Sequence, residues 1–241
     1  MKQANPTGTE EVLGRCESER EQLALLRLCH LVSPALPIGA YAYSQGLEYA
    51  VHAGWVSDEV TALQWLEGLS RHALGTLDLP ILLRLHRGWS GADIAAVRSW
   101  SAHLIAARET AELRAEERHL GRALARALIE MGVSEAGAWL DADAAFAALF
   151  GLAAVRWYIR ETECLSGYLW AWSENQVLAA IKLVPLGQSA GLRLLHRLTN
   201  SIPAIVTAAL RVGDAEIGVG VVAPTLASAL HESQYSRLFR S

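Results

Sequence analysis

The densest group of ionisable side chains in the sequence is a run of arginines and glutamates from Arg108 to Arg118. Clustered acids and bases of this kind can transfer protons in catalysis. The spacing favours a different interpretation. Arg108 and Glu112 are four residues apart, and Arg114 and Glu117 are three apart, as in ion pairs along the surface of a helix. We therefore predict a solvated or partner-facing helix flank here rather than a catalytic cluster.

A metal site would need several nitrogen, sulfur or carboxylate ligands at fixed spacing. The eight histidines are scattered singly and the three cysteines are far apart. Cys29 and His30 are neighbours, so on a helix they point apart, and His119 with Glu116 or Glu112 is a weak ligand set. We predict no metal site and no cofactor.

Two further kinds of chemistry lack their motifs. No GxxxxGK[ST] sequence is present to bind the phosphates of a nucleotide, so we predict that the chain is not a GTPase. No GxSxG sequence is present to hold a nucleophilic serine. The sequence therefore predicts no enzyme, and a helical enzyme acting on a small molecule is kept as the alternative.

Composition narrows the class of protein. Of the 241 residues, 52% are hydrophobic and 19% charged, an apolar surplus that a large core and partner-covered surfaces would explain. The net charge of −4 offers no basic face for nucleic acid. The longest uncharged apolar stretch, Ile217–Leu230, is too short to span a bilayer, and the polar N-terminus has no signal-peptide pattern. We expect a cytoplasmic protein that binds neither nucleic acid nor membrane.

Apolar residues recur at helical spacing along most of the chain, and no convincing strand hairpin is present. No repeat or low-complexity linker divides it, so we predict an all-α, single-domain bundle of about ten helices. The segment from Asp93 to Met131, with only Gly121 as a weak breaker, should form one long helix or two nearly continuous ones. We predict a flexible N-terminal arm at residues 1–20, a helical domain at 21–230 and a partner-binding tail at 231–241.

Three segments have the composition of docking surfaces. The first is Ser33–Gly39 and the residues after it, a stiff turn that either tucks Leu36 and Ile38 into the core or presents them to a partner. The second is the polar Ser173–Gln176 within an apolar stretch, which is either a buried network or an interface patch continuing to Lys182. The third is the tail, whose aromatic, aliphatic and arginine side chains are typical of binding hot spots. The residues that we predict to bind partners are Pro37, Tyr43, Gln45, Glu48, Lys182, Pro185, Gln188, Tyr235, Arg237, Leu238, Phe239 and Arg240.

Four segments taken together resemble the UreF family of urease accessory proteins, and they span nearly the whole chain. They are Ser33–Gly39 with Tyr43–Glu48, Arg108–Thr110 with Glu112–Arg114, Lys182–Gln188, and the tail His231–Ser241.

The resemblance implies an all-helical protein that forms a homodimer and works without catalysing a reaction. It implies binding to UreD, called UreH in some organisms, and to the GTPase UreG, in an assembly that loads nickel into apo-urease (UreABC). It also implies that the tail orders against UreD and that the face around Lys182 influences UreG. Two hypotheses stay open within it: a passive scaffold, or a regulator that gates GTP hydrolysis by UreG.

Overall fold

The computed structural model describes residues 8–218 and 222–241, with side chains from residue 17 onward. These residues form ten α-helices and no strand, which confirms the prediction of an all-α domain. The helices are α1 (Gly8–Leu31), α2 (Leu47–His52), α3 (Glu59–Leu69), α4 (Leu79–Ser90), α5 (Ile94–Ala106), α6 (Ala111–Glu130), α7 (Phe146–Arg156), α8 (Glu161–Leu183), α9 (Gln188–Ala209) and α10 (Val222–His231). Short 3-10 turns lie at Ala40–Ala42, Ser134–Trp139 and Asp214–Glu216.

Helices α3 and α4 are joined by a π-helical segment, Ser70–Asp78, so that the chain stays helical throughout this region. The wider turn ends at Asp78, whose side chain is buried although it is ionisable. Buried charges need partners, and the carboxylate of Asp78 accepts hydrogen bonds from the Arg108 guanidinium.

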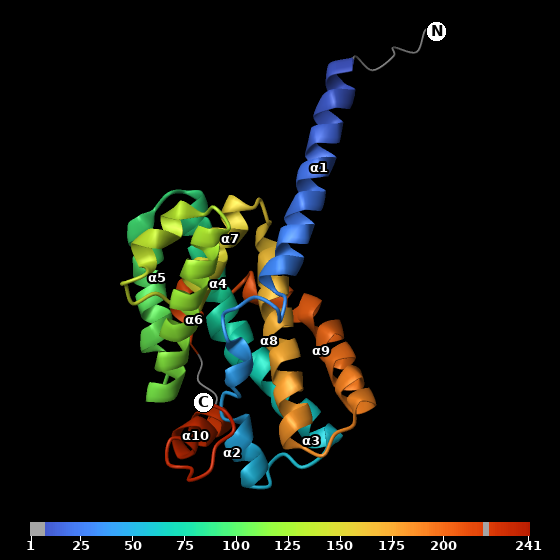
Figure 1. The fold of residues 1–241 in the computed structure, drawn as a ribbon, viewed down its shortest axis with the longest axis vertical. Coiled ribbons are helices and arrows are strands. Elements are labelled where there is room, and N and C mark those ends of the chain that lie inside the picture. The colour runs from blue at the N-terminus through green and yellow to red at the C-terminus, as the bar shows by residue number, and fades with distance from the viewer. Residues whose placement is uncertain (1–7, 219–221) are drawn as a thin grey trace.

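The segment from Asp93 to Met131 forms two helices, α5 and α6, that contact each other side by side (Figure 1). A single long helix is therefore wrong, because the chain turns at residues 107–110. Thr110 then caps α6 by accepting a hydrogen bond from the Leu113 N–H at 3.2 Å. Gly121 does not break α6. It lets the main chain at Ala144 pack closely against α6, since a Cβ at Gly121 would lie 2.3 Å from the main-chain oxygen of Ala144.

The core has two clusters of buried side chains. The larger one includes residues of every helix from α4 to α9 and of the end of α1, and α7 is buried on every side from Ala147 to Ala154. A helix without a polar face accounts for part of the high apolar content. The smaller cluster joins α2, α3, the end of α8 and α9, and it includes Phe239 from the tail.

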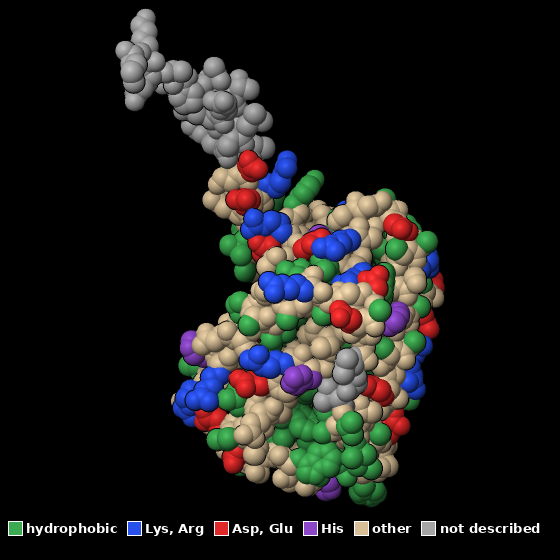
Figure 2. Space-filling model, turned by 180° about the vertical axis from the view of Figure 1, so that it is seen from behind, with side chains coloured by type: hydrophobic (Ala, Val, Ile, Leu, Met, Phe, Trp, Pro, Cys, Tyr) green, Lys and Arg blue, Asp and Glu red, His purple; other side chains and the backbone are tan. Residues whose placement is uncertain are grey.

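The two ends of the molecule differ. Helix α1 projects from the body, whereas α2 and α10 pack together at the opposite end (Figure 1). On the reverse face, charged side chains are spread over the upper part and hydrophobic ones gather near the end that holds α2, α3 and α10 (Figure 2). Helix α1 begins at Gly8, within the segment predicted as an arm, and residues 1–7 lie outside the described part. The division into arm, domain and tail stays a prediction.

In residues 8–218 and 222–241, none of the helices combines the length and the apolar character that crossing a bilayer requires.

Candidate functional site

The C-terminal tail is packed on the body of the same chain. Phe239 is 6% exposed and Ser241 is fully buried. The Arg240 N–H donates to the Ala42 oxygen at 2.9 Å, which ties the tail to the loop before α2. Ser44 donates to the main-chain oxygen of Ser241 twice, from its N–H at 3.0 Å and from its hydroxyl at 2.6 Å. The tail and the loop that precedes α2 therefore form one structural unit.

Glu48 is the main acceptor for the tail. Its carboxylate accepts hydrogen bonds from the N–H groups of Leu238 at 2.6 Å and Phe239 at 2.9 Å. The Glu48 side chain is buried, so these bonds replace water around a charged group. Glu48 was predicted to face a partner, and here it holds the chain's own tail.

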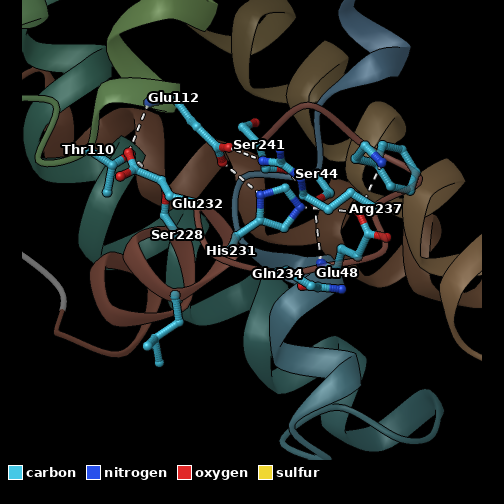
Figure 3. Close-up of polar contacts among 12 residues, drawn as sticks. Ser44, Glu48, Thr110, Glu112, Ser228, His231, Glu232, Gln234, Arg237 and Ser241 are labelled. Atoms are coloured by element: carbon cyan, nitrogen blue, oxygen red, sulfur yellow. Dashed lines mark hydrogen bonds and ion pairs between the residues drawn. The ribbon is translucent and has the colours of Figure 1, made fainter.

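His231, at the end of α10, lies between two carboxylates and is fully buried (Figure 3). Its Nε2 is 3.2 Å from Glu48 and its Nδ1 is 2.7 Å from Glu112. Because carboxylate oxygens only accept hydrogen bonds, a ring nitrogen that carries a proton donates it to the acid that it faces. The Arg237 guanidinium also donates to Glu112, at 2.5 Å. Two acids and two bases thus connect α2, α6, α10 and the tail.

The predicted residues of the first docking segment divide between surface and interior. Pro37 is exposed, whereas Leu36 is buried and Tyr43 is 5% exposed. Of the two alternatives for Leu36, the structure therefore has the one in which its side chain packs in the core. Burial raises the pKa of Tyr43, and a hydrogen bond with Arg240 opposes that rise. Gln45 donates to Glu116 at 2.7 Å and accepts from the Trp172 indole at 2.7 Å. Tyr43 and Gln45 therefore make contacts within the chain.

The second predicted segment adjoins the tail. Lys182, on the last turn of α8, is exposed, and its Nζ lies 5.7 Å from the centroid of the Phe239 ring, a cation–π distance. Pro185 and Gln188 are also exposed, at the α8–α9 connection. Within Ser173–Gln176, Asn175 donates to the main-chain oxygen of Tyr43 at 3.3 Å. Gln176 is fully buried, but neither polar atom of its amide has a hydrogen-bond partner in the described part of the chain, so it is not part of a buried network.

The tail has an inner and an outer side. Phe239 points inward, while Tyr235 is fully exposed and Leu238 is 66% exposed. Arg237 and Arg240 are exposed as well. Tyrosine and arginine are enriched among the residues that dominate binding energy. The outer side therefore has the composition of a docking surface on a rigid support.

The arginine–glutamate run is a helix surface only in part, because residues 111–118 belong to α6 but Glu116 and Glu117 are buried. Arg108 lies in the turn before α6, and its guanidinium donates to the carboxylates of Asp78 and Glu117. The predicted pair with Glu112 is wrong because the helix begins only at residue 111. The predicted pair of Arg114 with Glu117 is also wrong, since Arg114 donates to the main-chain oxygen of Arg108 at 2.6 Å.

Among the described side chains, no cation is paired with the neighbouring carboxylate of Glu116. It accepts from the Gln45 amide at 2.7 Å and the Ser241 hydroxyl at 2.8 Å. Burial raises the pKa of Glu116 to about 7, although both hydrogen bonds oppose the rise. Burial also lowers the pKa of Arg108, but Asp78 and Glu117 outweigh it and hold that pKa well above its usual range.

The raised pKa of Glu116 predicts a pH-dependent stability. The folded state binds the proton more tightly than the unfolded chain, so this contribution is complete below pH 4.5 and is lost as the pH rises through about 7. Glu116→Gln, which cannot titrate, should gain stability relative to the wild type between pH 5 and pH 8, by up to about 3 kcal/mol. Urea unfolding of both proteins at several pH values measures this difference. A difference that is the same at pH 5 and pH 8 would contradict it.

A cavity of about 130 Å³ lies beside this cluster, with Asp78, Arg108, Glu116, Glu117 and Tyr168 in its wall. The alternative of a small-molecule enzyme requires a cavity of this kind, ringed by groups with shifted pKa values. The carboxylate oxygens of Asp78, Glu116 and Glu117 all accept hydrogen bonds from the protein itself. Glu174 also lies in the wall, and burial raises its pKa.

Among the described side chains, no group of three or more His, Cys, Asp or Glu residues is placed to hold a metal ion. Cys29 is exposed and Cys164 is buried, and burial raises the pKa of the Cys164 thiol far above its usual range.

The sequence model of the urease accessory protein UreF matches residues 56–199. The chain belongs to the UreF family. It is 51% identical over 220 residues to the urease accessory protein UreF of Alkalilimnicola ehrlichii, which covers 91% of this chain and 96% of that protein. It is 50% identical to the same protein of Teredinibacter turnerae, covering 90% and 98%, and 44% identical to that of Hahella chejuensis, covering 91% and 99%.

Sequence reasoning missed several residues of this UreF-family site. The contacts of Asp78 with Arg108, of Ser44 with Ser241 and of His231 with two acids have no local signature, because these partners lie 30 to 197 positions away. The only available signal was the presence of ionisable residues inside apolar stretches, which need buried partners.

Proposed function

We propose that the chain is a non-catalytic scaffold that helps to insert nickel into apo-urease. Its relatives carry the name urease accessory protein, and that name supports a role in urease maturation. The observation that carries the proposal is the tail, whose inner side is fixed to the body while Tyr235 and Leu238 are exposed on its outer side.

The proposed partners are UreD (UreH), the GTPase UreG and apo-urease (UreABC). The outer side of the tail, with Tyr235, Arg237 and Leu238, is the proposed contact with UreD. Lys182 and the exposed residues that follow it, Pro185 and Gln188, are the proposed face toward UreG. Family resemblance carries two further parts of the proposal, a homodimer in the assembly and a cytoplasmic location.

The test is nickel loading in cells that express the urease operon with this gene deleted and then restored. We expect deletion to leave urease poor in nickel and inactive, and the intact gene to restore both. A gene ending at Gln234 should fail to restore them, because it lacks both sides of the tail. Nickel content per urease, measured by elemental analysis, and urea hydrolysis are the readouts.

A surface variant separates lost folding from lost docking in that test. Tyr235→Ala with Leu238→Ala removes only exposed side chains, so thermal unfolding should change little, while nickel loading should fall. Full loading by the gene ending at Gln234 would contradict the proposed role of the tail, and full loading after deletion would contradict the function itself.

Lys182→Ala tests whether this lysine enters the GTPase as a catalytic cation. We expect multiple-turnover hydrolysis by UreG in the assembly to stay within about twofold, against the 10³-fold or greater fall that loss of an inserted finger causes. The reason is that the Lys182 Nζ is already placed over the Phe239 ring. Lys182→Arg is the matched control. A thousandfold fall with Lys182→Ala alone would favour the gating regulator over the passive scaffold.

The helical small-molecule enzyme is the second candidate, because the cavity beside Arg108 meets its main requirement. A metabolite screen by thermal unfolding distinguishes the two candidates. A saturable stabilisation by one organic metabolite, lost in Glu116→Gln but kept in Glu130→Gln, would favour the enzyme.

A further inference from the structure

The cavity opens toward the segment predicted to dock partners, so a partner could reach its charged end. We take as its mouth the side where lining residues reach the surface, on the loop after α1 and on α8, with the half-buried Ile38 and the exposed Tyr41 and Leu178. Tyr41 is 66% and Leu178 40% exposed. The mouth is therefore accessible and mainly apolar. A role for this mouth in docking rests on the proposed function, in which the chain binds other proteins.

The inner end of the cavity has more negative than positive charge. Asp78, Glu116 and Glu117 lie in its wall with Arg108 as the only cation among its described lining residues, and Glu174, whose pKa burial also raises, is the fourth acid of the wall. Arg108 binds Asp78 and Glu117, so Glu116 is left with the neutral donors Gln45 and Ser241. A buried carboxylate without a cation is stabilised strongly by a positive charge that arrives beside it.

Tyr168 supplies a second, independent sign of a ligand. Its side chain is 7% exposed, and its ring packs edge-on against Phe150 at a centroid distance of 5.2 Å. Nearby carboxylates, chiefly those of Asp78 and Glu117, help burial to raise the pKa of Tyr168 far above its usual range, which places the hydroxyl near the acidic wall. Within the described part of the chain this hydroxyl forms no hydrogen bond, so its oxygen is available to accept one from a ligand.

An apolar mouth leading to an acidic end fits a particular shape of ligand. Lysine and arginine side chains carry a cationic head on an aliphatic stem, and they bury the stem against apolar surface. We propose that the cavity receives a lysine or arginine side chain of a protein partner, with its stem along Leu36 and Ile38 and its head beside Glu116 and Tyr168.

Binding of a cation there is coupled to a proton. Glu116 is about half protonated near pH 7 in the free chain. A cation at the site favours the carboxylate, so formation of the complex releases part of a proton at that pH.

The experiment titrates the chain with UreD and, separately, with UreG by calorimetry at pH 7 in phosphate and in Tris, which differ in ionisation enthalpy. We expect one partner to release roughly half a proton per complex, the fraction set by a pKa near the working pH. Glu116→Gln should abolish the release and weaken that complex at least about thirtyfold, because it removes one member of a buried charge pair. Glu130→Gln, the same change at an exposed site of α6, should leave both quantities unchanged.

A second variant tests the proposal independently, in case Glu116→Gln weakens the complex only because it folds poorly. Tyr168→Phe removes only the hydroxyl, and it should weaken the same complex by roughly tenfold, the loss expected for one hydrogen bond to a charged group, with unchanged thermal unfolding.

Three outcomes would overturn the proposal. Complexes of undiminished affinity in both variants, without proton release, would leave the scaffold function standing and remove the cavity as a docking site. A divalent metal ion that binds the isolated chain only when Glu116 is present, with no proton-linked partner binding, would assign the cavity to a metal instead. If neither UreD nor UreG binds the wild-type chain, both the proposed function and the docking site are wrong.

Discussion

Arg108→Met should lower the free energy of unfolding by about 3–5 kcal/mol, the usual cost of removing one member of a buried ion pair. The Arg108 side chain is 15% exposed, and its partners Asp78 and Glu117 are 4% and 8% exposed. Without the guanidinium, two carboxylates remain buried with no cation. The Glu117 carboxylate also accepts from the N–H of Phe146, the first residue of α7, at 2.9 Å. Because Arg108 would no longer hold this carboxylate in place, the start of α7 should loosen as well.

Thermal and urea unfolding of the variant measure this loss. For a chain of this size the midpoint should fall by roughly 6–20 °C. Arg87→Met is the matched control, because Arg87 also pairs with a carboxylate, that of Glu161, but its side chain is 58% exposed, and we expect a loss of less than about 1 kcal/mol. Asp78→Asn with Glu117→Gln should recover part of the loss in the Arg108→Met background. Equal losses for Arg108→Met and Arg87→Met would show that the cluster does not stabilise the fold.

The helices were predictable because their signals are local. Apolar side chains at helical spacing need no knowledge of the rest of the chain, and the cap at Thr110 follows from its type. The predicted ion pair of Arg108 with Glu112 was wrong because it too was inferred from local spacing alone. The rule for residues four apart holds only inside a helix, and a turn at residues 107–110 removes Arg108 from α6. The partner that then matters, Asp78, is thirty positions away.

The tail is a second case in which local sequence predicts only part of the structure. Its composition indicates binding, because Tyr235, Arg237 and Arg240 are of the types that dominate binding energy. Composition does not reveal which residues bind the chain itself. That division depends on Glu48 and Ser44, about 190 positions earlier, so Phe239 is buried while Tyr235, four positions before it, is exposed. The assignment of the outer residues to a partner stays a prediction.

Glu48→Ala should release the tail and lower the free energy of unfolding by about 3–5 kcal/mol, since it leaves several buried polar groups without a partner. The N–H groups of Leu238 and Phe239 would lose their acceptor. His231 would keep only Glu112 as a carboxylate partner. Loss of these bonds should also free Phe239 from the smaller core cluster.

Limited digestion with trypsin detects the released tail directly. Cleavage after Arg237 needs an extended segment around the bond, and in the wild type the following N–H is bound to Glu48 at 2.6 Å. The wild type should therefore resist, while Glu48→Ala should lose residues 238–241 within minutes, as mass spectrometry would show. Tyr235→Ala is the control in the same segment, because its side chain is fully exposed, and it should change neither stability nor digestion. A Glu48→Ala protein that keeps its tail as long as the wild type does would show that Phe239 and Ser44 hold it without the carboxylate.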